Sequence, residues 1–184
     1  MRWSAILRRS WWNMQAGMRE IELTQGKVAL VSDKDYARVI AYGKWYAVKG
    51  RGDVWYAARN ESRQYCVSRY RRRIFLHRFV LNINDDKIEV DHKNLNGLDN
   101  QRRNLRIASR NENMHNRKKC ANNTSGYKGV HLHMGRVWLT HIKINGKTKH
   151  IGVYKSLIKA AQAYDVAAVK YYGKFACLNF SREA

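Results

Sequence analysis

The 184-residue sequence has no proline, three cysteines and only fourteen acidic residues. Without proline, we expect turns to be formed by glycine, asparagine and aspartate. Cys66, Cys120 and Cys177 lie far apart and form no C-x-x-C pair. This spacing excludes a disulfide framework and a thiolate zinc ribbon, and it favours an intracellular protein with reduced thiols. No apolar run approaches the length of a bilayer span, so we expect no membrane partner.

Positive charge is what the sequence has in excess. Thirty-six lysines and arginines against fourteen acidic residues give a formal net charge of +22, with a sequence pI near 10.3. The excess is spread over the whole chain rather than collected in a tail, and it occurs in segments that also contain aromatic residues. Such a distribution favours a polyanion as partner, and nucleic acid before others.

We expect an α+β protein whose first part is rich in β-strands. Between Lys27 and Arg73, the short alternating or aromatic runs KVALVS, KWYAVKG, DVWYAARN and QYCVSRY are separated by turn residues, which is typical of strands. The basic opening MRWSAILRRSWWNMQAG resembles no signal or transit peptide. We expect it to be disordered or to result from a start codon upstream of Met18. An arm that touches nucleic acid and an amphipathic interfacial segment are the alternatives.

A polar region follows a short predicted helix in the run IFLHRFVL, in which Leu76, Phe79 and Val80 share one face. The next stretch is full of asparagine and arginine and too poor in apolar groups to fold by hydrophobic burial alone. It contains a strand, a loop, a second strand at NLRIA, and a helix that begins with the capping box formed by Ser109 and Glu112. The sequence therefore predicts a compact hairpin-plus-helix unit.

Four residues of this unit are suited to phosphodiester hydrolysis. A neutral His92 can accept a proton near neutral pH, and an asparagine carbonyl such as that of Asn104 can hold its other ring nitrogen. One carboxylate, Asp91, and one amide oxygen, from Asn113, suit a hard divalent ion that keeps open positions. We expect Mg²⁺, with Mn²⁺ as an alternative.

The run from Phe75 to Asn116, with LHRFVL and then VDHKNLNGLDNQRRNLRIASRNENMHN, resembles the HNH motif of homing endonucleases carried by phages and mobile introns. The resemblance implies a ββα-metal fold in which His92 is the general base and Asn104 orients it. It also implies that Asp91 and Asn113 bind the metal, Asn113 standing where other members have a second histidine. His77 matches a histidine that these relatives often carry, and we assign it no catalytic role.

The last third of the chain predicts a three-stranded antiparallel sheet and one helix. The strands are joined at Gly135 and at the hairpin signal Asn145-Gly146. Ser156 is a good N-cap for the helix LIKAAQAYDVAAVKYY, and Gly173 stands where a C′ residue belongs.

Residues Tyr127 to Phe180 resemble the DNA-binding domain of plant ethylene-response factors (ERF), also called Apetala-two, through SGYKGV, W-x-x-x-I-K, IGVY, AAQAYDVAAVKYYG and LNF. In that family the sheet lies in the DNA major groove. Several family arginines are His or Lys here, so no base preference is implied. A metal site formed by His131, His133 and His141 is a rival interpretation. The positions that match the DNA-binding residues are Lys128, His131, His133, Arg136, Trp138, Lys143 and Lys149.

We therefore expect a site-directed, metal-dependent DNA endonuclease that acts on double-stranded DNA as a monomer, with no small-molecule cofactor. The alternatives are a DNA-binding transcription or architectural factor without cleavage activity, and an RNA-directed role such as that of a maturase. The expected organisation is a basic tail (1–17), a β-rich region (18–75), an HNH nuclease motif (76–119), a linker (120–126) and an ERF-type domain (127–180).

Overall fold

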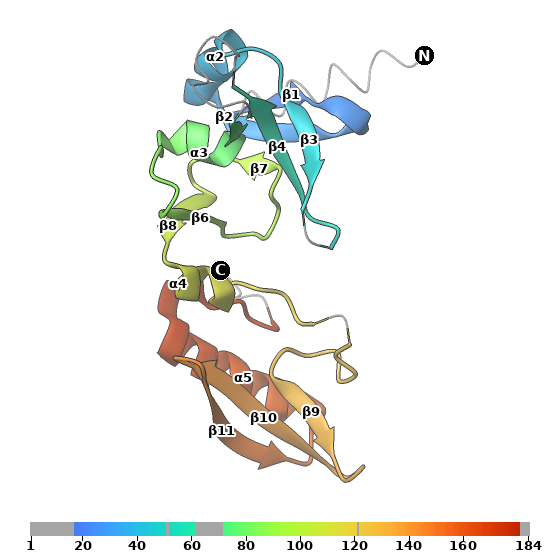
Figure 1. The fold of residues 1–184 in the computed structure, drawn as a ribbon. Helices are drawn as coiled ribbons and strands as arrows, with labels where there is room; N and C mark the ends of the chain where they lie inside the picture. Colours follow the sequence, from blue (N-terminus) through green and yellow to red (C-terminus); the bar gives the residue numbers. More distant parts are fainter. Residues whose placement is uncertain (1–16, 51, 62–71, 121, 181–184) are drawn as a thin grey trace, which may run out of the picture. The chain divides into compact units, whose positions relative to one another are not determined.

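A computed structural model of the chain describes residues 17–50, 52–61, 72–120 and 122–180. By their internal contacts these residues divide into two compact units, the first ending at Ile107 and the second beginning at Ala108. Both units combine strands with helices (Figure 1), so the expectation of an α+β protein is confirmed. The division falls within residues 76–119, the segment predicted to hold the nuclease motif.

The described residues of the first unit form small sheets and two α-helices. Strands β1 and β2 pair antiparallel, and β7 adds to β2 in parallel; β3, β4 and β5 form an antiparallel sheet, and β6 pairs with β8. The elements are β1 (Met18–Glu22), β2 (Val28–Ser32), α2 (Asp33–Ala41), β3 (Tyr46–Lys49), β4 (Trp55–Asn60), β5 (Arg73–Phe75), α3 (Leu76–Leu81), β6 (Glu89–His92), β7 (Asp99–Asn100) and β8 (Leu105–Ala108), with a 3-10 turn η1 at Thr24–Gly26.

Several predicted elements of this unit are confirmed. The runs KVALVS, KWYAVKG and DVWYAARN contain β2, β3 and β4, and IFLHRFVL contains α3 with Leu76 and Val80 fully buried. The run QYCVSRY lies outside the described residues, as does the tail up to residue 16. The purely β-rich expectation missed α2, whose sequence signals are Ser32 at the N-cap and two aspartates in the first turn.

The core of the first unit is formed by side chains from most of its elements. Val39 of α2, Leu76 and Val80 of α3, and Val31 of β2 are completely buried, and Trp45 lies beside them at the start of β3. The indole Nε1 of Trp45 donates to the carbonyl oxygen of Val39 at 3.1 Å. This position favours tryptophan, because the ring is buried while its indole N–H keeps a hydrogen-bond partner.

A buried ion pair connects α2 to the end of the polar region. Asp35 is 3% exposed, and both of its oxygens accept hydrogen bonds from Arg102, at 2.8 and 2.9 Å. Arg102 also donates to the carbonyl oxygen of Val80 on α3 at 2.7 Å, and Arg38 adds a bond to Asp35 at 3.2 Å. Burial by itself would raise the pKa of Asp35, but the two arginines lower it overall.

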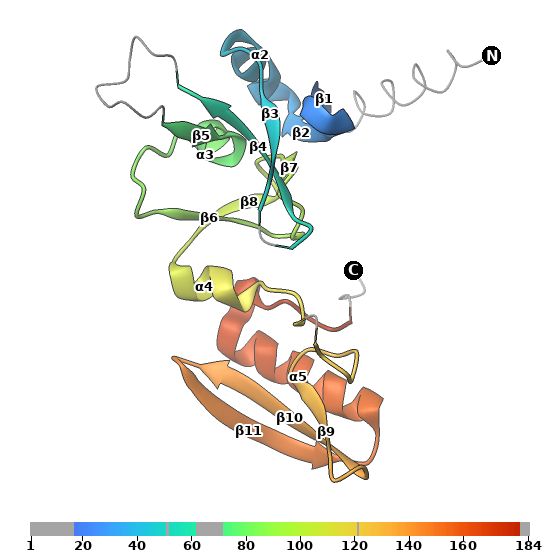
Figure 2. The same cartoon turned by 45° about the vertical axis from the view of Figure 1, so that its right-hand side comes forward.

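The second unit consists of a short helix, an antiparallel sheet with strand order β11-β10-β9, and a long helix that covers one face of the sheet (Figure 2). Its elements are α4 (Arg110–His115), β9 (Val130–His133), β10 (Val137–Ile144), β11 (Lys147–Tyr154), α5 (Leu157–Tyr172) and the 3-10 turn η3 (Gly173–Phe175). On the covered face, Ile142 packs on Tyr164 and Ala168, and Val130 packs on Ala160. The predicted three strands and helix are confirmed.

The predicted turns and caps of the second unit are also found. Asn145 and Gly146 both have positive φ, 48° and 81°, as the two-residue hairpin requires. The Ser156 side chain accepts a bond from the backbone of Lys159, and Gly173 ends α5 with φ of 54°. Among the helices that the structure describes, none is long and apolar enough to cross a bilayer.

We predict that Arg102→Met lowers the free energy of unfolding by about 3 kcal/mol, because it leaves the Asp35 carboxylate buried without its main partner. Urea denaturation of the variant and of the wild type measures the difference. Arg103→Met is the matched control, since Arg103 is adjacent but exposed, and we expect it to change stability by less than about 0.5 kcal/mol. Equal losses in the two variants would show that the ion pair is not stabilising.

Candidate nucleic-acid interface and hydrolytic site

The strand β6 ends at Asp91 and His92, as the sequence predicts, and both side chains are buried, at 4% and 7% exposure. The two-stranded pairing of β6 with β8 holds this end of the strand, and the backbone of Lys93 donates to the carbonyl oxygen of Asn104 at 2.9 Å. The hairpin therefore holds an acid and a histidine at consecutive positions of a fixed piece of backbone.

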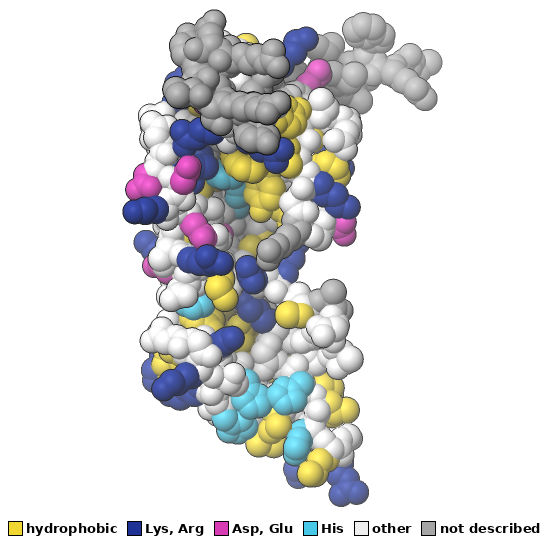
Figure 3. All heavy atoms as spheres, in the orientation of Figure 1, with side chains coloured by type: hydrophobic (Ala, Val, Ile, Leu, Met, Phe, Trp, Pro, Cys, Tyr) yellow, Lys and Arg dark blue, Asp and Glu magenta, His cyan; other side chains and the backbone are white. Residues whose placement is uncertain are grey.

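The imidazole of His92 lies among aromatic rings and one amide. Its Nε2 is 3.5 Å from Oδ1 of the completely buried Asn100. The ring of His77 on α3 is 5.1 Å away between centroids, and that of Tyr56 on β4 is 5.9 Å away. An amide oxygen only accepts hydrogen bonds, so this contact favours a proton on Nε2 and leaves Nδ1 as the basic nitrogen. Figure 3 shows histidine among hydrophobic side chains on this unit.

Burial favours the neutral form of both histidines. It lowers the pKa of His92, and the nearby Asn100, Asp91 and Asp99 oppose this only in part. Burial lowers the pKa of His77 to about 3, and Nδ1 of His77 finds no hydrogen-bond partner among the described residues. Burial and the charge of Asp91 raise the pKa of Tyr56. A neutral imidazole is the form that accepts a proton.

The predicted metal ligand Asp91 is already bound by a cation. Arg106 on β8 donates to its Oδ2 from Nε at 2.7 Å and from a terminal nitrogen at 2.5 Å. Carboxylate and amide oxygens are the ligand types that Mg²⁺ and Mn²⁺ accept, so the donor chemistry of Asp91 and Asn113 fits such an ion. The Arg106 guanidinium would compete with it for the same carboxylate.

Asn104 holds the loop that follows His92. Its Nδ2 donates to Oδ1 of Asn94 at 3.0 Å and to the carbonyl oxygen of Asp99 at 2.7 Å, and its Oδ1 accepts from the backbone of Asn94 at 3.0 Å. The Asp99 carboxylate in turn accepts from Asn94 and Gln101. The amide oxygen at Nε2 of His92 belongs to Asn100. That Asn104 orients the His92 ring stays a prediction.

The fourth predicted residue, Asn113, lies on α4 in the second unit. The capping box predicted at Ser109 and Glu112 is present. The other end of α4 is anchored within its own unit, since Nζ of Lys128 donates to the carbonyl oxygens of His115 at 2.8 Å and Arg117 at 2.6 Å.

The ring of His115 on α4 stacks on that of Tyr172 on α5, with 3.8 Å between centroids. This contact and the bonds from Lys128 make α4 part of the second unit's packing.

The uncovered face of the sheet β9–β10–β11, called here the outer face, carries histidine and lysine. Thr140 and Ile142 of β10 point toward α5, where Thr140 donates to the carbonyl oxygen of Ala160 at 3.1 Å. Because side chains alternate along a strand, Leu139, His141 and Lys143 point the other way. Figure 3 shows histidines gathered on this unit.

Three histidines contact one another across the strands of the outer face. The rings of His131 and His141 are parallel to within 10° with centroids 4.9 Å apart, and His150 Nδ1 is 3.4 Å from His141 Nε2. The sequence analysis missed His150, although the Asn145-Gly146 hairpin sets His141 opposite it. The rival metal site was predicted to contain His133, not His150. Among the described residues, no three His, Cys, Asp or Glu side chains are arranged to hold a metal ion.

The predicted DNA-binding residues divide into two groups. His131, His133 and Lys143 lie on the outer face by strand alternation, and Arg136 is exposed at the turn before β10.

The other three residues make contacts inside the unit. Trp138 packs in the core cluster with Val130, Lys149 donates to the hydroxyl of Tyr171 at 2.8 Å, and Lys128 anchors α4. The reason is the alternation of the strands, which puts Trp138 and Lys149 on the helix side of the sheet.

Comparison with known proteins concerns one region. A 60-residue stretch, 32% of this chain, is 37% identical to dehydration-responsive element-binding protein 1E of Arabidopsis thaliana. The match covers 33% of that protein, so the chain spans about a third of the relative's length. No protein-family model matches the chain. The similarity supports an ERF-like DNA-binding region, and it does not bear on the nuclease motif.

We predict that Asn104→Ala loosens the loop from Lys93 to Asn104, because the amide of Asn94 loses its acceptor. Hydrogen exchange followed by NMR should show faster exchange of the Asn94 amide, while the core amides of β2 keep their protection. Asn111→Ala on the exposed surface of α4 is the control and should change neither. Unchanged exchange at Asn94 in the Asn104 variant would contradict the assigned network.

Proposed function

We propose that the protein binds double-stranded DNA through the outer face of the sheet β9–β10–β11. The observation that carries this proposal is the location of His131, His133 and Lys143 on the face of the sheet that α5 leaves open, in a chain of net charge +22. The similarity of a 60-residue stretch to the dehydration-responsive element-binding protein 1E of Arabidopsis thaliana supports the proposal.

A sheet face of this kind suits the major groove of DNA. The groove of B-form DNA is wide enough for strands, and side chains directed from adjacent strands reach bases and phosphates together. Lysine provides a point charge for phosphates and histidine a hydrogen-bond donor, whereas among the described residues of this face the two-pronged arginine match to guanine is available only from Arg136 at the turn. The composition of the face therefore favours backbone contacts over base selection.

We predict that the double variant His131→Ala/Arg136→Gln binds a 20-base-pair duplex about tenfold or more weakly than the wild type, because two contacts of the outer face are removed. Fluorescence anisotropy in EDTA measures the dissociation constant. Lys155→Gln removes the same formal charge from an exposed position after β11, and we expect less than a twofold effect. Equal losses in the variant and the control would reject the outer face as the DNA-binding surface.

We also propose, as a second function, that the protein is a metal-dependent DNA endonuclease. The specific observation in its favour is that His92, next to Asp91 on β6, is buried and has Asn100 at its Nε2. In this proposal Nδ1 of His92 accepts a proton from the attacking water, and Asn100 and the loop held by Asn104 keep the ring oriented. A divalent ion bound through Asp91 and Asn113 would supply stabilisation of charge on the phosphate and the leaving oxygen.

We predict that His92→Ala abolishes nicking of supercoiled plasmid in Mg²⁺ or Mn²⁺, because the proton acceptor is lost, while DNA affinity in EDTA stays within about twofold of wild type. Conversion to nicked and linear plasmid on agarose gels, beside the anisotropy titration, measures both. A variant that nicks as fast as the wild type would remove His92 from the mechanism. If the wild type binds DNA tightly but nicks plasmid in neither metal, the endonuclease proposal is rejected and the protein is a DNA-binding factor without cleavage activity.

These experiments need the full chain. The helix that carries Asn113 is anchored by Lys128 and stacked on Tyr172 through His115, so a fragment that ends at residue 120 would lack the partners that order this helix. If the two modules were independent, such a fragment would lose only DNA affinity and site selection. We expect it to lose the ordered helix α4 as well.

A further inference from the structure

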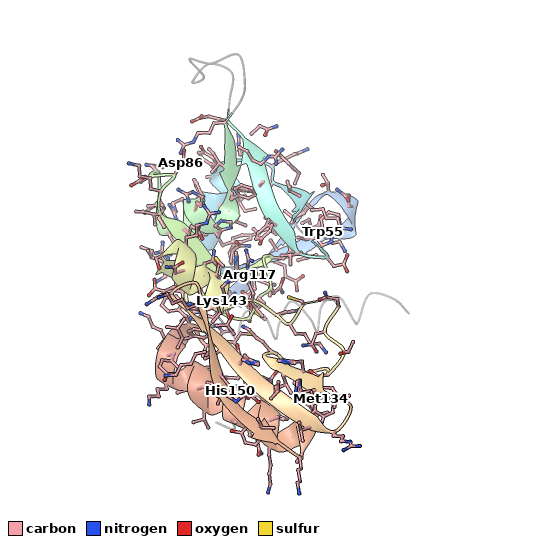
Figure 4. All side chains as sticks on the ribbon, turned by 60° about the horizontal axis from the view of Figure 1, so that its bottom comes forward. Trp55, Asp86, Arg117, Met134, Lys143 and His150 are labelled. Carbon is pink, nitrogen blue, oxygen red and sulfur yellow. The ribbon has the colours of Figure 1, made fainter. Side chains whose placement is uncertain are left out.

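The second unit contains a cavity of about 530 Å³ between the chain that follows α4 and the strand β10. Residues 117–120 and 122–123 form one side, and Ile142, Lys143, Asn145 and Gly146 form another. Tyr164 and Tyr172 of α5 also line the cavity. Figure 4 labels Arg117 and Lys143, which both belong to the lining.

The charge of this cavity is one-sided. Five basic residues line it, and none of the described residues in its lining is an aspartate or a glutamate. The lining amides of Asn111, Asn122 and Asn123 add uncharged hydrogen-bonding groups. Like charges gathered around one space repel one another, so the cavity favours an anionic occupant. The five basic residues are Arg117, Lys118, Lys119, Lys128 and Lys143. We call this space the basic cavity.

Lys128 builds the basic cavity as well as lining it. Its ammonium donates to the carbonyl oxygens of His115 and Arg117 and so fixes the chain where α4 ends. The three successive basic residues 117–119 begin at this fixed position. Lys119 Nζ donates to the carbonyl oxygen of Gly126 at 2.8 Å, which closes the other end of the segment. Burial lowers the pKa of Lys128, which fits an ammonium removed from water.

The basic cavity continues onto the outer face. A shallower hollow of about 420 Å³ is lined by His131 and Thr148, and it shares Asn123, Gly129 and His141 with the basic cavity. Gly129 is required here, because a Cβ atom at its φ of 75° would lie 2.1 Å from the ring of Tyr164. A ligand that lies across the outer face would therefore reach the basic cavity without interruption.

We propose that the basic cavity is a second DNA-contact site, which holds the phosphodiester backbone of a duplex that lies on the outer face. This inference rests on the proposed DNA binding and deepens it by assigning backbone contacts to the segment 117–119. Three successive solvent-exposed basic residues, Arg117, Lys118 and Lys119, fit successive phosphates along a strand better than a single small anion. Contacts to phosphates contribute affinity and its salt dependence, not sequence choice.

The test compares two double variants that lose the same charge. Arg117→Gln/Lys118→Gln alters the basic cavity, and both side chains are exposed, which limits the effect on folding. Lys155→Gln/Lys159→Gln alters exposed residues at β11–α5 outside the lining. Anisotropy titrations of a 20-base-pair duplex in EDTA, repeated from 50 to about 300 mM KCl, give the slope of log affinity against log salt. Thermal melting followed by circular dichroism checks that all variants are folded.

We expect the cavity variant to bind about tenfold or more weakly near 150 mM salt, with a slope shallower by one to two, since each lost phosphate contact removes about 0.9 from the slope. The control should keep the wild-type slope. The inference is overturned if the two variants behave alike while His131→Ala/Arg136→Gln still loses affinity, which leaves the proposed DNA binding intact. A wild type that binds no duplex overturns both.

Discussion

The polar region of the first unit depends on a network of amides and one carboxylate in which Asp99, Gln101 and Asn104 are buried and Asn94 is exposed. Asn104 binds Asn94 and the backbone of Asp99, and the carboxylate of Asp99 binds Asn94 and Gln101. These hydrogen bonds stabilise the loop, whereas apolar burial stabilises the rest of the unit. A buried polar group is tolerated only when it is hydrogen-bonded. The segment is therefore asparagine-rich for a structural reason, whatever chemistry His92 performs.

The elements that sequence analysis located well are those with strong local signals. Alternating strands, the capping box at Ser109, the Asn145-Gly146 turn and the cap at Ser156 are determined by residues close together in the chain. The helix α2 has similar signals, but KVALVS before it and KWYAVKG after it led to a uniform β assignment. Its fixed position comes from Arg102, which is far away in sequence and bonds to Asp35.

The candidate sites show the same limit. Asp91 and His92 were placed correctly at the end of a strand because their positions follow from the run IEVDH. That Asn100 lies on the His92 ring depends on how the loop folds back, which no local pattern encodes. On the outer face, strand alternation from the hairpin register separates Lys143 from Lys149 and Trp138. That register follows from the Asn145-Gly146 turn, so the composition of the outer face is encoded locally in the sequence.

The motif that reads as continuous in sequence is divided between the two units. The strand β8 ends at Ala108 and α4 begins at Arg110, and the intervening Ser109 commits its side chain to capping α4. The helix is then ordered by Lys128 and Tyr172 from the second unit. Lys128 therefore serves two purposes, since it fixes both Asn113's helix and the basic segment 117–119. The basic segment 117–119, which we propose contacts DNA, therefore follows directly on the predicted metal-binding helix, and both are held by the ammonium group of Lys128.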